Sequence, residues 1–276
     1  ETKKEAQAKL DAFTPKIGYP DEWQDYSSLE IREDDPVGNA RRVRIFETED
    51  NFSQLGQPID KGEWGMTPQT VNAYYSSTRN EIVFPAAILQ APFFDPAADD
   101  AVNYGAIGAV IGHEIGHGFD DQGRKSDGTG ALRDWWQAED KERFEEKTKA
   151  LGAQYATYEP VPGYAINPEL TMGENIGDLG GLAMAYSAYK LSLNGEEAPV
   201  IDGFTGDQRF FMAWAQVWKS LYREEALKQQ VATDSHSNGK FRVNGVVRNM
   251  DEWYAAFDVS EDDDLYLPPE ERVSIW

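Results

Sequence analysis

The sequence predicts one α+β domain that is mostly α-helical and carries a small sheet. A length of 276 residues, of which 40% are hydrophobic and 12% aromatic, is typical of a globular chain with a sizeable core. Helix-forming stretches dominate the chain, whereas strand-like segments are few and short. No internal repeat or low-complexity linker divides the sequence, so we expect a single domain over residues 1–276.

The first segments of the chain predict a helix, a loop and a strand. Residues 1–13 are a charged helical stretch that Thr14-Pro15 ends, because proline disfavours helix at the residue before it. Lys16–Asp25 contains glycine, proline and aspartate and is predicted to be a loop. The acidic stretch that follows ends in Val43–Phe46, which is strand-like in composition.

Two short segments then predict the sheet. Thr70–Tyr75 and Glu81–Phe84 are strand candidates, and the turn-forming residues 76–80 between them favour a hairpin. Pro85 ends the second strand. Ala86–Phe94 is apolar but too short to span a membrane, so we expect it to be buried.

The remaining elements are predicted to be helices. Ala101–Phe119 is apolar on nearly all sides and predicts a buried central helix. Asp134 is a suitable N-cap for an amphipathic helix over Trp135–Tyr155. After a loop at Thr233–Lys240 the chain ends in a short helix and a proline-containing tail. The other predicted helices are Met172–Leu193, the aromatic-rich Asp207–Lys228 and Met250–Phe257.

The composition of the chain limits the classes of partner and function that it can have. There are 49 acidic and 26 basic residues, a formal charge of −23 that argues against nucleic acid as a partner. Solubility explains this charge most simply, and a preference for cationic substrates is the weaker alternative. No cysteine is present, and no apolar run approaches the ~18 residues of a membrane span. Because the sequence starts at Glu1, we expect a processed or excised piece.

The central helix carries the motif H-E-x-x-H at His113, Glu114 and His117. In a helix the two histidines lie about 40° apart around the axis and one turn along it, so both can reach one ion. Glu114 points to a neighbouring sector, within reach of a water on that ion. A core helix that carries two histidines by chance is the alternative. The chain has only 3 histidines, and two of them are here, which favours the metal site.

A third metal ligand has two possible sources in zinc proteases with this motif. A histidine six residues after His117 is excluded, because Gly123 is there and Asp120 replaces the required glycine. A glutamate from a later helix is available as Glu174, with Asp178 four residues on and on the same face. Asp178 could then hold the far nitrogen of a ligand histidine. The alternative is a solvated acidic face, but the neighbouring residues are apolar, where unpaired carboxylates would be costly.

His236 is the remaining histidine, in a polar loop. It is either an ordinary surface histidine or a donor to the oxyanion that forms when water attacks a peptide carbonyl.

Taken together, these motifs resemble the neprilysin family of zinc metalloendopeptidases, in particular a bacterial oligopeptidase member. The resemblance covers nearly the whole sequence and rests on ordered matches at Val71–Tyr75, Ile82–Ala86, Ile88–Gln90, Pro92–Phe94, Val110–Asp121, Gly173–Gly181, Ala215–Trp218, His236–Arg242 and Trp276.

The resemblance implies a thermolysin-like zincin catalytic domain with one Zn²⁺ ion. It implies that His113, His117 and Glu174 are the zinc ligands and that Glu114 is the base that activates the zinc-bound water. Asp178 would be the partner of His113, and Asp120 the partner of His117. His236 would stabilise the transition state. Residues implied to bind substrate are Asn72, Ala73 and Arg242 at the peptide backbone, and Ile88, Phe93, Val110, Val217 and Trp218 in a pocket for a bulky hydrophobic residue after the scissile bond.

The family's proteases are more than twice as long and have a helical N-terminal region that caps the active site. This chain resembles only the C-terminal catalytic part, so the cap is expected to be absent or to be a second chain that pairs with it. The family's habits also imply an extracytoplasmic location, periplasmic or secreted, and oligopeptide substrates. Two alternatives stay open: a zinc-stabilised module that cannot turn over substrate without the cap, and a zincin of an unrelated family.

Overall fold

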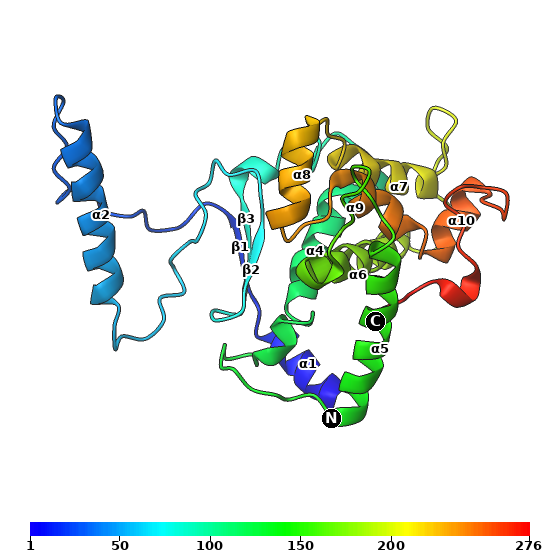
Figure 1. Cartoon of the computed structure of the whole chain (residues 1–276), viewed down its shortest axis with the longest axis horizontal. Helices are drawn as coiled ribbons and strands as arrows, with labels where there is room; N and C mark the ends of the chain where they lie inside the picture. Colours follow the sequence, from blue (N-terminus) through cyan, green and yellow to red (C-terminus); the bar gives the residue numbers. More distant parts are fainter.

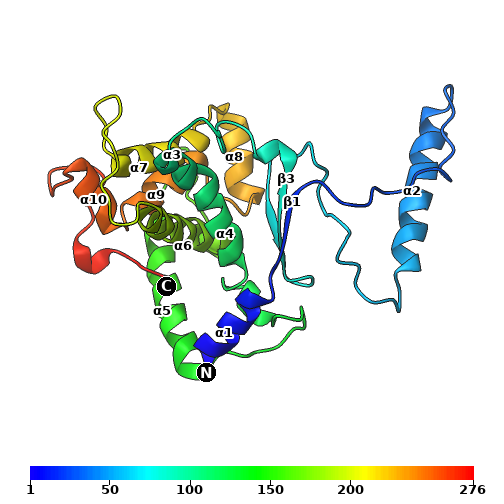
Figure 2. The same ribbon diagram turned by 180° about the vertical axis from the view of Figure 1, so that it is seen from behind.

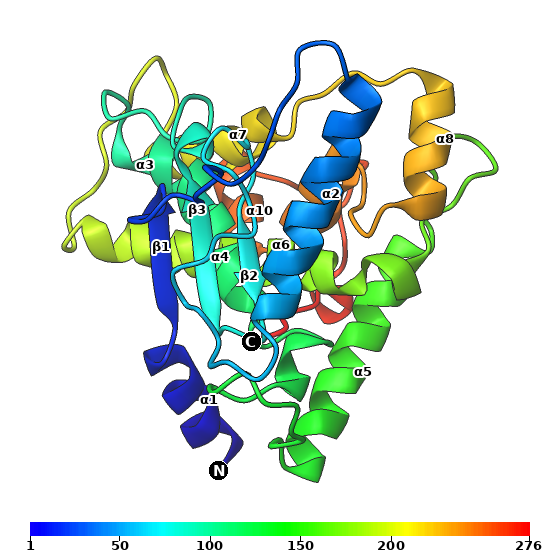
Figure 3. The same cartoon turned by 90° about the vertical axis from the view of Figure 1, so that its left-hand side faces the viewer.

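Three short strands form a sheet beside the helical body of the molecule (Figure 3). The computed structural model describes all residues 1–276. β1 (Thr14–Gly18) and β2 (Tyr74–Ser76) lie on either side of β3 (Glu81–Pro85), with β1 parallel and β2 antiparallel to it. The predicted hairpin is therefore present, and helices make up most of the rest. The predicted α+β class, predominantly helical with a small sheet, is confirmed.

The predicted central helix is present and consists of three consecutive segments. α3 (Asp100–Asn103) leads through a π-helical turn (Tyr104–Gly108) into α4 (Ala109–His117). α4 packs most extensively against α6 (Pro168–Ser192), which starts with Asn167 as N-cap and proline at its first position. Figures 1 and 2 show this pair at the centre of the molecule from both sides.

Glycines let the two helices approach closely. A Cβ atom on Gly112 of α4 would lie 2.5 Å from the carbonyl oxygen of Gly181 on α6. A Cβ atom on Gly177 would lie 2.8 Å from Nδ1 of His113. Real side chains do not occupy such positions, so these glycines are needed to place α6 against the motif helix.

Several of the other helices pack around this pair and build the core. The largest hydrophobic cluster contains Trp214, Tyr155, Tyr189 and Phe210, all fully buried, and a smaller cluster lies between the sheet and α4. None of the helices is both long and apolar enough to cross a membrane. The remaining helices are α1 (Thr2–Asp11), α2 (Pro36–Ser53), α5 (Ala138–Tyr155), α7 (Gly206–Val217), α8 (Glu224–Thr233), α9 (Gly239–Val247) and α10 (Asp251–Phe257), with 3₁₀ turns at Ala86–Ile88, Gly123–Lys125 and Pro269–Glu271.

The prediction of a strand at Val43–Phe46 is wrong, because this segment lies within α2. Asp35 caps the helix by accepting a hydrogen bond from the amide of Gly38 at 2.9 Å, and Pro36 is its first residue. α2 stands apart from the body, joined to it by two extended connections, and none of its residues is buried (Figure 1).

The prediction of a loop from Lys16 is also wrong in part, since Thr14–Gly18 is the edge strand β1. Pro15 is tolerated there because an edge strand leaves one side of its backbone unpaired. Nζ of Lys16 lies 2.7 Å from the buried carboxylate of Glu81 on β3, and this ion pair helps fix the strand.

The single helix predicted over Asp207–Lys228 is two helices, α7 and α8. Residues 218–223 between them are non-helical, although they contain no glycine or proline. The ring of Trp218 instead stacks on the guanidinium of Arg242, 3.6 Å from its centroid. A tertiary contact has overridden local helix propensity here.

Three smaller predictions need correction. Asp134 is not the N-cap of α5, which starts three residues after Trp135 because that indole is buried and donates to the carbonyl of Ser126. α9 begins inside the predicted loop Thr233–Lys240 and was not predicted. In the apolar segment Ala86–Phe94 only Ile88 is buried.

Candidate metal centre

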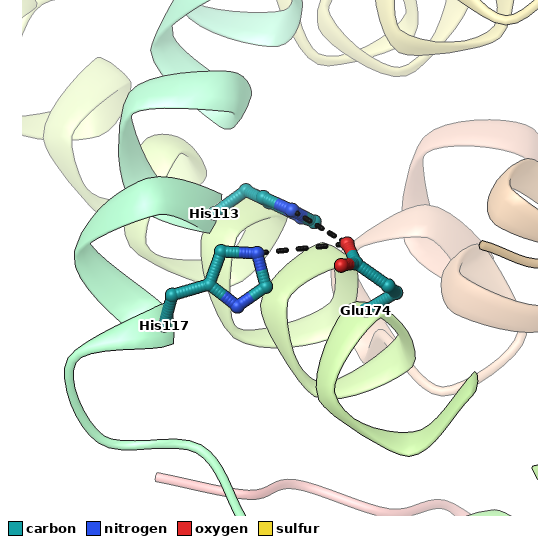
Figure 4. A group of neighbouring side chains, drawn as sticks. All are labelled: His113, His117 and Glu174. Atoms are coloured by element: carbon teal, nitrogen blue, oxygen red, sulfur yellow. Dashed lines mark ion pairs between the residues drawn. The ribbon is translucent and has the colours of Figure 1, made fainter. Parts of the chain in front are cut away.

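His113 and His117 lie one turn apart on α4 and direct their rings towards the same point (Figure 4). Their ring centroids are 4.5 Å apart and the ring planes meet at 83°. The π-helical turn immediately before α4 is a local geometry that is frequent at functional sites. His113 is buried and His117 half-buried.

Glu174 reaches both histidines from α6. Its Oε2 atom lies 3.1 Å from Nε2 of His113 and 3.5 Å from Nε2 of His117. The potential ligand atoms of the three residues all lie within 4.8 Å of one another. The structure thus brings together the three residues that the sequence suggested as a metal-binding set.

Asp178, one turn further along α6, lies behind His113. Its Oδ1 atom is 2.8 Å from Nδ1 of His113, so Nδ1 faces a carboxylate and Nε2 faces the cavity. The guanidinium of Arg242 donates to both oxygens of the same carboxylate, at 2.7 and 2.6 Å. Burial alone would raise the pKa of Asp178, but the charge and hydrogen bonds of Arg242, together with the contact to His113, outweigh burial and lower it.

Asp120 gives His117 an equivalent partner. Its Oδ2 atom lies 2.7 Å from Nδ1 of His117. Its Oδ1 atom accepts the amides of Gln122 and Gly123, at 2.9 and 2.7 Å. Both histidines therefore have Nδ1 on a carboxylate and Nε2 towards Glu174, the orientation that favours metal binding through Nε2.

His236 also points at the site, although it comes from the loop before α9. Its Nε2 atom lies 3.1 Å from Oε2 of Glu174, and its Nδ1 atom lies 2.9 Å from Oδ1 of Asp234. Ser237 ties the loop to α6 by donating to Asn175 at 2.8 Å. The sequence prediction missed Asp234, although an aspartate two residues before a histidine could have indicated it.

A cavity of about 630 Å³ opens in front of these groups. All the residues predicted to bind substrate line it, whereas Asp120 and Asp178 lie behind their histidines. The sequence prediction missed several further lining residues, which come from the sheet side, from α7, α8 and their connection, and from the loop before α9 and the first residue of α9: Met66, Val71, Tyr74, Tyr75, Trp214, Lys219, Ser220, Tyr222, Gln230, Asp234, Ser237 and Gly239.

The carboxylates at the cavity differ in their electrostatics. Burial alone would raise the pKa of Glu174, but the surrounding imidazoles hold it far below its usual range. Burial raises the pKa of Glu114, and its buried Oε2 atom has no hydrogen-bond partner. For His113, burial lowers the pKa, but contacts with Asp178 and Glu174 outweigh burial and raise it.

The donor set fits a metal ion. Oε2 of Glu174 is buried among three imidazole nitrogens, yet it makes no hydrogen bond of regular geometry. Two imidazole nitrogens and one carboxylate oxygen form a donor set found in catalytic zinc sites, in which the fourth position stays open. A cation among these atoms would replace the protons that otherwise hold them together.

An H-E-x-x-H helix with a glutamate from a second helix and a cavity in front of them is an arrangement found in zinc metallopeptidases. A model of Peptidase family M13 matches residues 72–273. The chain belongs to this family, which confirms the neprilysin-family resemblance.

Curated relatives of the chain support the same family assignment. The endothelin-converting enzyme homolog of Locusta migratoria is 45% identical over 267 residues, which cover 93% of this chain and 37% of that protein. Neprilysin of Homo sapiens is 40% identical over 290 residues, which cover 100% of this chain and 38% of that protein. The chain thus spans about two fifths of the length of these relatives.

Solved structures show the same fold. The zinc metalloprotease Zmp1 of Mycobacterium tuberculosis, in complex with an inhibitor, matches with a TM-score of 0.97 and 56% identity, over 100% of this chain and 43% of that one. PepO from Lactobacillus rhamnosis matches with a TM-score of 0.89 and 36% identity, over 100% of this chain and 42% of that one.

Proposed function

We propose that this chain is the catalytic part of a zinc-dependent endopeptidase that cleaves oligopeptides. The observation that carries the proposal is the convergence of His113, His117 and Glu174 at one end of a cavity large enough for a peptide segment. Each histidine has a carboxylate on its far nitrogen, as ligand histidines in metal sites do. Family membership supports the same reading.

One Zn²⁺ ion would be held by His113, His117 and Glu174. When bound, it would supply Lewis-acid polarisation of the peptide carbonyl and make water more acidic. Asp178 and Asp120 keep the two imidazoles in the tautomer that leaves Nε2 free.

Glu114 acts as the base in this proposal. It lies on α4 between the two histidines, at the cavity wall, and its free Oε2 atom can accept a proton from the attacking water. Burial raises the pKa of this carboxyl group, which suits a base that must later return the proton to the leaving amine.

His236 acts as the donor to the developing oxyanion. Its contact with Glu174 raises the pKa of the imidazole, and the hydrogen bond to Asp234 adds to the effect. The ring can therefore carry a proton on Nε2, which faces the cavity beside Glu174, and donate it to the oxyanion of a bound peptide.

The cavity supports a preference for a bulky hydrophobic residue after the scissile bond. Ile88, Phe93, Val110, Val217 and Trp218 give one part of it an aliphatic and aromatic lining. Asn72 and Ala73 precede β2, which is paired with β3 on one side only, so a substrate backbone can lie along its free edge. Arg242 faces the same cavity while Asp178 balances its charge.

Other parts of the proposal rest on the sequence alone. That residues 1–276 form one catalytic domain, that an N-terminal cap pairs with it as a second chain, and that the protein is extracytoplasmic all stay predictions.

The test is hydrolysis of a fluorogenic peptide by the zinc-loaded chain, compared with Glu114→Gln. The variant keeps the size of the side chain but cannot accept the proton, so we expect the same zinc content and a loss of kcat of about 10²–10⁴-fold. Normal hydrolysis by the variant would contradict the role of Glu114. Peptides that differ only in the residue after the scissile bond would test the preference for a bulky side chain.

A further inference from the structure

A buried lysine outside the cavity holds the backbone that follows the motif helix α4. Lys9 of α1 is 2% exposed. Its ammonium group donates three hydrogen bonds, to the carbonyl oxygens of Gly118 at 2.6 Å, Gly123 at 2.8 Å and Ser126 at 2.7 Å. All three N–H groups of the ammonium are thus used on backbone that directly follows α4.

The surroundings of this ammonium are aromatic. Tyr75, Phe119 and Trp135 place their ring centroids 5.7, 5.6 and 5.9 Å from Nζ. The indole of Trp135 donates to the carbonyl of Ser126, one of the three acceptors of Lys9. Burial lowers the pKa of Lys9 to about 8, so the group keeps its proton, and its three donors, at neutral pH.

The backbone that Lys9 holds carries Asp120. Gly118 is the C-cap of α4, directly after His117, and its carbonyl would otherwise lack a partner at the helix end. Gly123 donates its amide to Oδ1 of Asp120 and accepts Lys9 on its carbonyl. Lys9 therefore donates to backbone carbonyls on both sides of Asp120. The other carboxylate oxygen of Asp120, Oδ2, lies 2.7 Å from Nδ1 of His117.

We propose that Lys9 is a positioning residue for the metal centre, which fixes Asp120 against His117 by holding residues 118–126 on one ammonium group. Lys9 lies before residues 72–273, which the family model matches, and α1 contributes no residue to the cavity. In this proposal α1 acts on the site only through the three hydrogen bonds of Lys9. The inference rests on the proposed metal centre but not on peptide hydrolysis.

The first test compares the zinc-loaded chain with Lys9→Met, which keeps the length of the side chain and removes the ammonium. Lys4→Met, on the exposed side of the same helix, is the matched control. The signals of the Nδ1 protons of His117 and His113 in proton NMR are the readout, because Asp178 holds His113 independently of residues 118–126. We expect the His117 proton to exchange with water about 10-fold faster or more, while the His113 proton is unchanged.

Zinc release into a chelator gives a second readout of the same samples. We expect release from Lys9→Met to be about 10-fold faster than from the wild type and from Lys4→Met, at the low end of the effect of ligand-partner changes. An unchanged His117 signal with unchanged release would overturn the proposal. A parallel change at both histidines would also overturn it, since this would indicate general loosening of the fold.

If Lys9→Met does not fold, Lys9→Arg tests whether Lys9 positions Asp120 against His117. It keeps the charge, but a planar guanidinium cannot reproduce the tetrahedral arrangement of three donors, so the His117 signal should again change selectively. If His117 behaves as in the wild type, the proposal fails.

A metal-free measurement separates this proposal from the proposed function. In the wild-type chain without metal, the amides of Gln122 and Gly123 should be protected from hydrogen exchange by Asp120, and Lys9→Met or Lys9→Arg should remove that protection while α6 stays protected. A wild-type chain that binds no zinc would refute the proposed function. Unchanged protection of these two amides in the variants would refute the role of Lys9.

Discussion

At the scale of single residues, the carboxylates of the site have different roles because their surroundings differ. Glu114 has a free oxygen and a pKa raised by burial, which suits proton transfer. Glu174 faces imidazoles and keeps its charge, which suits a ligand. Asp178 is balanced by Arg242 and holds His113. Sequence spacing alone could suggest these roles, but only burial and partners distinguish them.

His236 provides the sharpest residue-scale prediction, because it faces Glu174 as closely as His113 does. As an oxyanion donor, it should be needed for turnover but not for metal binding. We expect His236→Gln to lower kcat by about 10²–10³-fold and to leave zinc affinity unchanged, measured by peptide hydrolysis and chelator competition. Strongly reduced zinc affinity would instead make His236 a ligand, and unchanged turnover would make it an ordinary surface histidine.

The residues that the sequence could predict are those whose relation is local or carried by a motif. His113 and His117 are one helical turn apart, and Glu174 and Asp178 repeat that spacing on a second helix. Lys9 was not predictable, because its acceptors are more than a hundred positions away in the chain. No periodicity of α1 indicates that one of its lysines is buried.

At the scale of elements, the close contact of α4 and α6 is the condition for the site. Glu174 and Asp178 can reach α4 only because glycines face each other across the contact. Gly112 meets backbone there, whereas a Cβ atom on Gly116, one turn on, would find its nearest contact at an ordinary 3.6 Å. Two glycines of one helix therefore have different tolerance for substitution.

This difference gives an element-scale prediction. Gly112→Ala should destabilise the fold by about 1–3 kcal/mol through overpacking and should weaken zinc binding. Gly116→Ala should be neutral or stabilise by up to about 1 kcal/mol, because alanine favours helix and the space is free. Chemical denaturation of both variants, with zinc affinity measured alongside, checks the pair. Equal effects of the two substitutions would show that helix spacing does not limit the site.

Secondary structure was predictable where local signals and tertiary contacts agree. The hairpin and the central and α6 helices have such signals. The strand β1 needed its long-range pairing with β3, and the break after α7 needed the stacking of Trp218 on Arg242. In α2, β-branched and aromatic residues favoured a strand, but the Asp35-Pro36 start signal was stronger.

At the scale of the whole molecule, α2 and its connections form an arm that adds little to the core. No residue of α2 is buried, and apolar side chains such as Val37 and Phe52 are 81% and 67% exposed. The ion pair and hydrogen bond that anchor the connection to the body involve Glu63, beyond the helix. The metal centre and the core lie in the other elements.

Replacing residues 27–58 by a flexible glycine/serine linker should therefore leave the body intact. Since the segment holds no core residue, we expect the free energy of unfolding to change by less than about 1 kcal/mol, within the range of surface changes, and zinc affinity to be unchanged. Denaturant unfolding and chelator competition provide the measurements. A loss of several kcal/mol would mean that the arm stabilises the body through contacts that burial does not reveal.

Metal content is the most direct measurement of whether His113, His117 and Glu174 form a zinc site. Elemental analysis of the dialysed wild-type chain should give one zinc per chain. Glu174→Val, which is apolar and cannot coordinate, should lower the occupancy to a small fraction while the protein stays folded. A wild-type chain without zinc, or a Glu174→Val chain with full occupancy, would contradict the metal centre described above.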